Sequence, residues 1–579
     1  MQIIKNKIKT AAVIFAAVCI ITGCGFFEES SSSEKTVFEA TSSDAAACKV
    51  SRDDFLLVSA DLTRISESNV GKTAYLIAYN TGAESISSEN TGGAYLYNIP
   101  SLSAKVENEF QTCADSELYT GVQENNSDFY IQQNCEIARK LQNLSLEQTV
   151  GMRSAEAMQL KRTCTVGETA AFYISYDEKT YKEVKFTLEA SGENCNIWYY
   201  DDIKDVSLGV RESSLDETFD VLAEKFDSVF YAEQAVFGSY EIENKNGAFI
   251  STPEKIDILI FDLEQDARSS ANGGGTYGFF NIVDIYTEEP VNRLNEKESA
   301  EYRTNQAECF YIDAYFLKDR PDKIYETLVH EFQHLLGFIN TVVNKGSSVY
   351  ETWYTEMMSQ LAEDILISYL GIEYEDSFLP GRMSWFNLYH NLGFYDWKSS
   401  VYAGYGNAYL FGSYLAHSYG GIDFIRTLAQ CGKINEEAVT FALKQTCNSD
   451  DFYTAFYKWG KSVLDGSLEN EINEKVCEYD FTLHGINVWD YSYTVRRSSI
   501  ALNYYGYTEN YEKSEEISGG GRLFYGPLIF KNTDTNYFRA SLGRGGFYIT
   551  NMGTVTYGDF IRACTENTSN SIRMFVYFE

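Results

Sequence analysis

Two histidines and one glutamate form an H-E-x-x-H pattern at His330, Glu331 and His334. In a helix, side chains four residues apart lie one above the other, so both imidazoles can bind one tetrahedral zinc ion. Glu331 lies beside them and can reach a water molecule at the metal without binding the metal itself. A carboxylate in that position can take a proton from the water and later deliver it to a leaving amine.

The residues around this pattern predict a helix that packs against a core. Ile324, Leu328 and Phe332 recur at helical spacing, and Asp322 stands where a helix N-cap is expected. The chain has five histidines. A chance H-E-x-x-H is therefore expected on the order of a few times per thousand such sequences. The pattern thus indicates a metal site, and Zn2+ as a single catalytic ion is the expected cofactor.

A catalytic zinc ion needs a third protein ligand. One zinc-protease pattern, H-E-x-x-H-x-x-G-x-x-H, would place a histidine at position 340, where this chain has Asn340. The third ligand is therefore expected from another part of the chain.

The next helical stretch, YETWYTEMMSQLAEDILISYL (350–370), offers carboxylates. We predict Glu356 as the third ligand, because it begins an amphipathic helix after a loop long enough for the chain to return. Glu351, Glu363 and Asp364 are the alternatives. Glu351 is expected before the helix, and Glu363 could instead hydrogen-bond to a ligand histidine.

Attack of water on a peptide bond builds negative charge on the carbonyl oxygen, so a hydrogen-bond donor is expected near the metal. We predict the hydroxyl of Tyr405, which opens YGNAYLFGSYLAH. Tyr402 and His417 are the alternatives, whereas His390 and His484 are expected to be structural.

Three segments carry a resemblance to a known family. TLVHEFQHLLGF, ETWYTEMMSQLAED and YGNAYLFGSYLAHSYGG resemble the hyicolysin family of bacterial metallopeptidases, whose pattern runs H-E-F-Q-H, W-x-x-E and Y-G-x-x-x-L-F. The resemblance covers roughly residues 160–450. It implies a gluzincin fold, one zinc ion and secreted endopeptidase activity, with His330, His334 and Glu356 as ligands and Glu331 as catalytic base.

The first residues predict export. A basic start with three lysines precedes the apolar run TAAVIFAAVCII, which ends in Ile-Thr-Gly-Cys24 and resembles the lipobox of bacterial lipoproteins. We predict a signal peptide over 1–23, lipidation of Cys24 and a lipid-anchored location in the bacterial cell envelope. An ordinary secretory signal is the alternative. Ten further cysteines permit disulfides, and no C-x-x-C pair supports a cysteine zinc site.

The elements that must position the candidate site predict an α+β protein. We expect a disordered tether over 24–47, a β-rich N-terminal region over 48–205, a zincin-like metallopeptidase domain over 206–470 and a C-terminal antiparallel β-domain over 480–579. GGGTYGFF (273–280) is expected to be either an edge strand that aligns a peptide substrate or a glycine loop.

Composition excludes one class of partner. The formal net charge is −36, which repels nucleic acid and anionic lipid, so no nucleic-acid partner is expected. The metal site and the family resemblance imply protein or peptide substrates, and membrane contact is expected only through the N-terminal lipid. The sequence favours a lipid-anchored zinc endopeptidase that acts on extracytoplasmic proteins. The alternative is a surface binding protein or adhesin with a vestigial zincin domain.

Overall fold

The computed structural model describes most of the chain from residue 42 onward. The described residues are 42–59, 63–86, 93–98, 127–146, 165–175, 180–200, 214–243, 247–263, 275–397, 400–446, 449–467, 470–496, 514–518, 521–531, 542–564 and 572–579. Contacts divide the chain into Met1–Thr41 and Ser42–Glu579. The expected signal peptide, the lipidated Cys24 and most of the expected tether lie outside the described residues.

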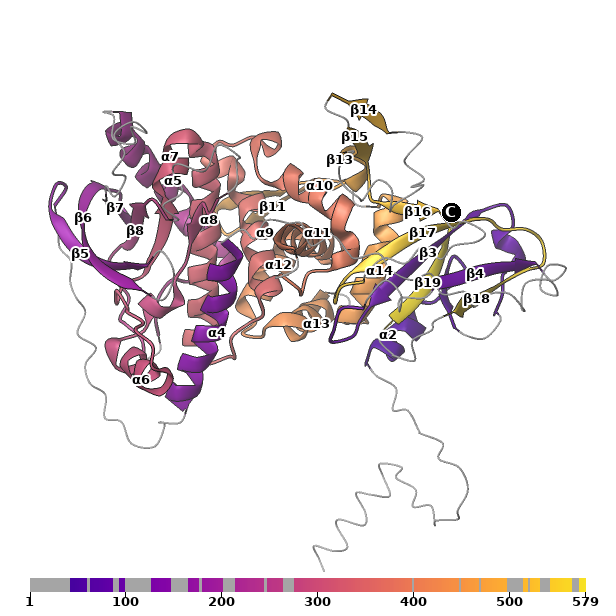
Figure 1. Cartoon of the computed structure of the whole chain (residues 1–579), viewed down its shortest axis with the longest axis horizontal. Helices are drawn as coiled ribbons and strands as arrows, with labels where there is room; N and C mark the ends of the chain where they lie inside the picture. Colours follow the sequence, from indigo (N-terminus) through magenta and orange to yellow (C-terminus); the bar gives the residue numbers. More distant parts are fainter. Residues whose placement is uncertain are drawn as a thin grey trace, which may run out of the picture. The chain divides into compact units, whose positions relative to one another are not determined.

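Helices and strands both contribute to the described part, which makes the protein α+β, as expected (Figure 1). The longer helices are α2 (Ser42–Val50), α4 (Ser127–Leu146), α5 (Ser214–Phe237), α6 (Glu288–Glu298), α7 (Ala314–Asp319), α8 (Pro321–Phe338), α9 (Thr352–Leu370), α10 (Leu379–Tyr389), α11 (Val401–Tyr419), α12 (Gly421–Gln430), α13 (Asn435–Thr446) and α14 (Phe452–Asp465). Among the helices of the described residues, none combines the length and apolarity needed to cross a membrane.

One mixed sheet lies next to the predicted metal helix. Its strands are β5 (Thr169–Ser175), β6 (Tyr181–Ser191), β7 (Cys195–Tyr199), β8 (Ile256–Phe261), β9 (Gly278–Phe279) and β10 (Cys309–Asp313), and their order in the sheet is β5-β6-β7-β8-β10-β9. β7, β8 and β10 are parallel, and every residue of β8 is buried. Burial along the whole length of a strand is typical of a strand covered on both faces.

Helices α5 and α8 pack on one face of this sheet. Phe226 of α5 contacts both Phe310 of β10 and Phe332 of α8, at ring-centroid distances of 5.9 and 5.1 Å. Phe172, Phe186 and Trp198 form a separate apolar cluster on the opposite face. The sheet thus fixes α8, while α9, α10 and α11 pack beyond it in the same core.

The short strand β9 is the edge of the sheet and runs antiparallel to β10. Of the two structures expected for GGGTYGFF, the edge strand is therefore present over Gly278–Phe279. An added Cβ at Gly278 would come within 2.7 Å of the Thr327 methyl group of α8 and of the Tyr311 carbonyl oxygen. Glycine at this position lets β9 run close beside α8.

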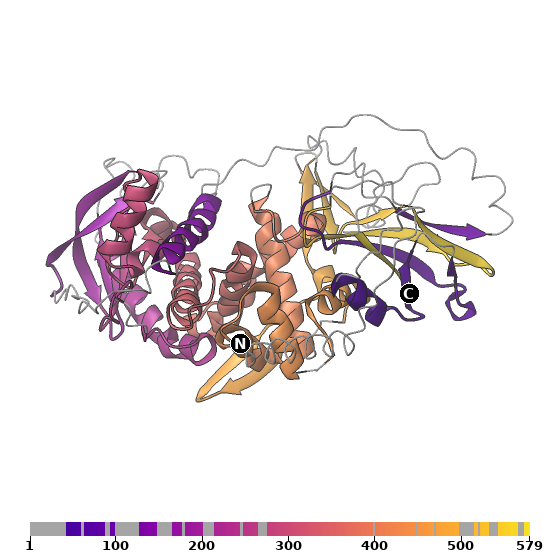
Figure 2. The same ribbon diagram turned by 90° about the horizontal axis from the view of Figure 1, so that it is seen from below.

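A second sheet joins strands from both ends of the chain (Figures 1 and 2). Its strands are β1 (Phe55–Val58), β19 (Ile572–Phe578), β3 (Thr73–Asn80), β17 (Phe547–Thr554) and β16 (Ile529–Lys531), in that order. β3 lies between β17 and β19 and is antiparallel to both. A smaller sheet repeats the arrangement, with β18 (Asp559–Cys564) between β2 (Thr63–Arg64) and β4 (Gly93–Asn98).

The remaining described strands form a three-stranded sheet and a hairpin. They are β13 (Ser492–Arg496), β14 (Glu515–Ile517) and β15 (Gly521–Tyr525) in the sheet, and β11 (Ile472–Val476) and β12 (Tyr479–Leu483) in the hairpin.

This pairing differs from the expected division into an N-terminal region over 48–205 and a C-terminal β-domain over 480–579. The strands before residue 100 pair with strands after residue 545, whereas β5 to β7 join the sheet of β8 and β10. Alternation of apolar residues identifies strands but does not specify their partners, because many strands share the same pattern.

The expected tether over 24–47 is also too long. Helix α2 begins at Ser42, and Ala46 and Ala47 are buried in the main core. The small alanine side chains allow α2 to approach α14, where the Tyr457 hydroxyl donates a hydrogen bond to the Ser43 carbonyl oxygen at 3.4 Å.

Candidate metal centre

Helix α8 carries both histidines on the side that faces helix α9. It begins at Pro321, whose fixed φ suits the first helical position, and Arg320 rather than Asp322 is its N-cap. Asp322 lies in the first turn, where its charge suits the positive end of the helix dipole. The expected N-cap was therefore wrong by two residues, because Pro321 can begin the helix itself.

Helix α9 packs against α8 and brings a glutamate to the histidines. Glu356 lies in its second turn and is fully buried. Glu351 is the N-cap residue and precedes the helix, as expected. Asp364 lies two turns later and accepts hydrogen bonds from Tyr409 and His484 instead.

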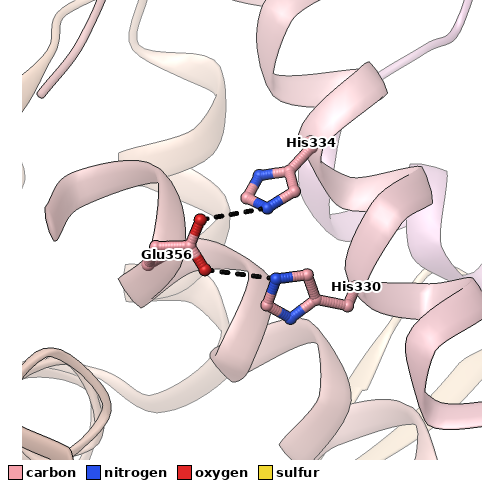
Figure 3. A group of neighbouring side chains, drawn as sticks. All are labelled: His330, His334 and Glu356. Atoms are coloured by element: carbon pink, nitrogen blue, oxygen red, sulfur yellow. Dashed lines mark ion pairs between the residues drawn. The ribbon is translucent and has the colours of Figure 1, made fainter. Parts of the chain in front are cut away.

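His330, His334 and Glu356 form a group that could hold a metal ion (Figure 3). Their ligand atoms lie within 4.8 Å of one another. The Nε2 atoms of His330 and His334 are each 3.2 Å from a different oxygen of Glu356. A tetrahedral ion with bonds of about 2.0–2.1 Å would separate its ligand atoms by about 3.3 Å, so the observed spacing fits such an ion.

The other ring nitrogens of the two histidines have their own partners. Nδ1 of His330 is 2.6 Å from Oε1 of Glu363. Nδ1 of His334 is 2.9 Å from the Thr355 hydroxyl and 3.0 Å from the Ser359 hydroxyl. The Ser359 hydroxyl donates to the Gln333 side-chain oxygen, so it accepts from His334. These acceptors place the proton on Nδ1, which leaves the Nε2 lone pairs directed at Glu356.

Glu356 supplies a test of whether the residues suit a cation. Both of its carboxylate oxygens are buried and lack a hydrogen-bond partner among the described residues. When both imidazoles are neutral and carry their protons on Nδ1, these oxygens face two nitrogen lone pairs, and buried acceptors that face only other acceptors are costly. A cation between the three groups removes this cost, so the donor set fits a metal ion.

The electrostatics agree with a site that attracts positive charge. Burial opposes the charged form of His330, but the carboxylates of Glu356 and Glu363 raise its pKa to about 10. Burial likewise opposes ionisation of Glu356, but His334 and His330 lower its pKa to about 2. Two buried carboxylates thus favour a cation at the imidazoles.

Glu363 is itself held by a buried arginine. Arg382 of α10 binds both oxygens of Glu363, with Nη2 2.9 Å from Oε1. Burial opposes ionisation of Glu363, but Arg382 and His330 hold its pKa below the usual range. The expected role of Glu363 as a hydrogen-bond partner of a ligand histidine therefore matches its position, and a bidentate ion pair fixes its orientation.

Glu331 lies in the same cleft as the histidines. The cleft has a volume of about 560 Å³ and is lined by residues of β9 and of α4, α8, α9, α10 and α11. Glu331 is 5% exposed, and burial raises its pKa, although His330 and His334 partly oppose this. A raised pKa brings a carboxylate closer to the value that a general base needs near neutral pH.

Tyr405 also lines the cleft, on the first turns of α11. Its ring lies 6.5 Å from the His330 ring, and the Arg382 guanidinium lies 5.7 Å from its centroid. Tyr402 lines the cleft as well, so both tyrosines remain candidates. His417 is not among the residues that line the cleft. Its Nε2 lies 2.9 Å from the His484 carbonyl oxygen.

Asn340, His390 and His484 lie outside the candidate metal group and make hydrogen bonds that connect parts of the fold. The Asn340 amide donates to the carbonyl oxygens of Ser239 and Leu336, which joins the end of α5 to the end of α8. His390 contacts the carbonyl oxygens of Phe547 and Leu528 through its two ring nitrogens. His484 binds Asp364. The structural positions expected for His390 and His484 agree with these contacts.

Sequence reasoning missed most of the residues that support the histidines. Thr355 and Ser359 were not predicted; with Glu363 they follow one another at intervals of four on α9, so the three side chains form one stripe toward the histidines of α8. This spacing was a usable signal. Arg382 lies on another helix, and no local pattern pointed to it.

Comparisons with family models and with curated proteins find no match to this chain.

Proposed function

We propose that this protein is a zinc-dependent peptidase of the gluzincin type. The observation that carries the proposal is the convergence of His330, His334 and Glu356 beneath a cleft that also contains Glu331. Two imidazoles and one carboxylate are the protein ligands of a common class of catalytic zinc sites, which leave a fourth position open. The resemblance to the hyicolysin family in the same residues supports the assignment.

The donor set favours zinc over harder divalent ions. Mg²⁺ and Ca²⁺ prefer oxygen ligands and higher coordination numbers, whereas imidazole nitrogen suits zinc and related transition metals. The hydrogen bonds at both Nδ1 atoms are typical of zinc-binding histidines.

A bound zinc ion would supply Lewis-acid chemistry and lower the pKa of water in the cleft. Glu331 accepts the proton of the attacking water and then donates it to the leaving amine. The Tyr405 hydroxyl stabilises the negative charge that develops on the carbonyl oxygen. Arg382 and Glu363 hold His330 in one orientation throughout the reaction.

The edge strand β9 offers a second element of the proposed function. It lines the cleft beside α8 and has one side free of strand partners among the described residues. An extended peptide can add to such an edge through backbone hydrogen bonds. We propose that substrate binds in this way and that protein or peptide chains outside the cytoplasm are the substrates, with the enzyme held at the cell envelope through a lipid on Cys24.

The proposal is tested on the zinc-loaded protein without residues 1–23, the expected signal peptide. We expect one equivalent of zinc, and hydrolysis of casein or of casein-derived peptides, followed by mass spectrometry, that stops when a chelator removes the metal. Glu331→Gln should retain zinc and lose about 10²–10⁴-fold in rate, because it removes proton transfer alone. Glu351→Gln, at the N-cap of α9, is the matched control and should retain activity.

Zinc binding without hydrolysis of any protein or peptide would contradict the proposal. It would favour the alternative, a surface binding protein with a vestigial site.

A further inference from the structure

Helix α4 approaches the cleft from the N-terminal part of the chain. Ile137, Ala138 and Leu141 are buried in the main core, so one face of α4 is a permanent part of the interior. At its other contacts, α4 packs against α6, α9 and β9. Asn134 and Cys135 line the same cleft as the candidate metal centre.

The free edge of β9 has a definite pattern of backbone groups. The Tyr277 carbonyl oxygen accepts a hydrogen bond from the Asp313 N–H of β10 at 2.9 Å. Alternate residues of a strand direct their N–H and C=O groups to opposite sides, so Gly278 and Phe280 present theirs to the side away from β10. These are the groups that a bound peptide strand would use.

The side chain of Asn134 already makes a hydrogen bond with one of these backbone groups. Its Nδ2 donates a hydrogen bond to the Phe280 carbonyl oxygen at 2.5 Å. A peptide strand paired with β9 would have to place its own N–H group at this point. The Asn134 side chain and the helix that carries it therefore stand in the path of such a strand.

Two polar contacts hold α4 against the chain that leads into α9. The Arg139 guanidinium donates to the Tyr350 carbonyl oxygen at 2.9 Å, and the Gln142 amide donates to the Ser347 carbonyl oxygen at 2.5 Å. On another side of the helix, Lys140 binds Glu298 of α6 at 2.9 Å. With its apolar face buried as well, α4 is a fixed wall rather than a loose cover.

We propose that α4 closes the Phe280 end of the cleft and limits the enzyme to substrates with a nearby amino terminus. This inference rests on the proposed peptidase function. β9 runs from Gly278 toward Phe280, so a peptide paired antiparallel to it has its amino-terminal residues beside Phe280. Antiparallel pairing is the more stable arrangement per residue, and it directs the amino end of the substrate at α4.

Helix α4 lies beside the candidate metal centre as well as beside β9. Tyr350, whose carbonyl oxygen binds Arg139, lies two residues before helix α9, which carries Glu356. Asn134 and Cys135 of α4 line the cleft together with His330 and His334. The substrates are therefore peptides cut close to their amino ends.

The test uses two series of synthetic peptides that share one cleaved sequence, found first by mass spectrometry of digested casein. One series is lengthened before the scissile bond and the other after it. With the zinc-loaded protein, we expect kcat/KM to fall at least tenfold as residues are added before the scissile bond. Lengthening on the carboxyl side should change kcat/KM less than threefold.

A triple variant tests whether α4 sets the limit on amino-side length. Asn134→Ala/Arg139→Ala/Gln142→Ala removes the polar contacts with β9 and the α9 approach, and should reduce the penalty for long amino-side extensions. Lys140→Ala, on the same helix but facing α6, is the matched control and should keep the wild-type limit. Circular dichroism checks that both variants are folded.

The outcomes separate the two proposals. Equal hydrolysis of both peptide series, or a limit on the carboxyl side alone, would overturn the role of α4 and leave the peptidase intact. A limit that persists unchanged in the folded triple variant would also overturn the role of α4. No hydrolysis of any peptide by the zinc-loaded protein would overturn the peptidase function, and this inference with it.

Discussion

A divalent cation would balance the charges of four buried residues at the candidate metal centre. Glu331, Glu356 and Glu363 carry three negative charges when ionised, and Arg382 carries one positive charge. A dication therefore makes the group neutral, whereas neutral histidines alone leave a net charge of about −2 in a buried region. Uncompensated buried charge is costly, so metal binding and the stability of this region are coupled.

Glu363→Gln tests this coupling at a residue that does not contact the metal position. The glutamine keeps a hydrogen-bond acceptor for His330 but loses the charge that holds Arg382 and the imidazole. We expect zinc affinity, measured by chelator competition, to fall about 10–100-fold, as for other groups that orient a ligand histidine. Glu356→Ala, which removes a direct ligand, should lose more.

Glu351→Gln provides the control for these two variants. Its carboxylate binds the Trp353 indole and lies at the N-cap of α9, outside the metal group. Zinc affinity should remain at the wild-type value. Unchanged affinity in Glu356→Ala would contradict the assignment of the third ligand.

Helices α10 and α11 approach each other closely enough to fix the two side chains that flank the histidines. Arg382 lies on α10 and Tyr405 on α11. A Cβ added at Gly406 would lie 2.8 Å from both the Arg382 carbonyl oxygen and the Phe386 nitrogen. Backbone atoms cannot rotate away, so only glycine permits this helix separation.

Gly406→Ala should therefore force the two helices apart. We expect a loss of about 1–3 kcal/mol in the free energy of unfolding, the usual cost of overpacking, together with weaker hydrolysis. Gly381→Ala is the control, since no atom lies within 4 Å of its added Cβ and alanine favours a helix interior by up to about 1 kcal/mol. Chemical denaturation measures the free energy of unfolding of the two variants. Equal stability of the two variants would contradict the close contact of α10 and α11.

Glu326 gives the contact between α8 and the start of α10 a dependence on pH. Its carboxylate accepts the Phe378 N–H at 2.7 Å, and burial and Glu363 raise its pKa to about 7. A pKa raised by folding favours the folded state most strongly below the unfolded value of about 4.5, and this contribution declines as pH rises to 7. The decline should be on the order of a few kcal/mol.

Urea unfolding between pH 4.5 and 8 measures this effect. The difference in stability between the wild type and Glu326→Gln should change over that interval in favour of the glutamine, which has no proton to lose. Parallel pH profiles of the two proteins would show that Glu326 ionises normally.

The candidate metal-binding residues of the site could be predicted from the sequence, because each follows from the spacing of residues within one helix. The histidines follow from their spacing on one helix, and Glu356 from its place near the start of the next amphipathic helix. Arg382 could not be found in this way, because its contact with Glu363 depends on how α10 packs against α9. The same limit applies to Asn134, whose partner Phe280 lies 146 residues further along the chain.

At the scale of the whole molecule, the first and the last of the described strands, β1 and β19, pair in the same sheet. β3 has no described strand neighbours except β17 and β19, both from the last 33 residues, and it packs through Tyr79 onto α14. This contact joins the N-terminal strands to the helical layer behind the site. Sequence reasoning assigned the two ends to different domains, because strand patterns give no information about pairing over nearly 500 residues.

A double-mutant cycle between the two ends tests this arrangement. Ile77 of β3 lies directly opposite Phe575 of β19, and both are fully buried. Ile77→Val and Phe575→Leu should each lower the free energy of unfolding, by about 0.5–1.5 kcal/mol for the isoleucine. Their combined effect should depart from additivity by about 0.5–3 kcal/mol, because the side chains are cross-strand neighbours.

Phe186→Leu provides the control, because Phe186 lies in the other sheet. Its effect on the free energy of unfolding should add to that of Ile77→Val to within about 0.5 kcal/mol. Additivity in the Ile77 and Phe575 cycle as well would mean that the two ends of the chain fold as separate units, as the sequence alone suggested.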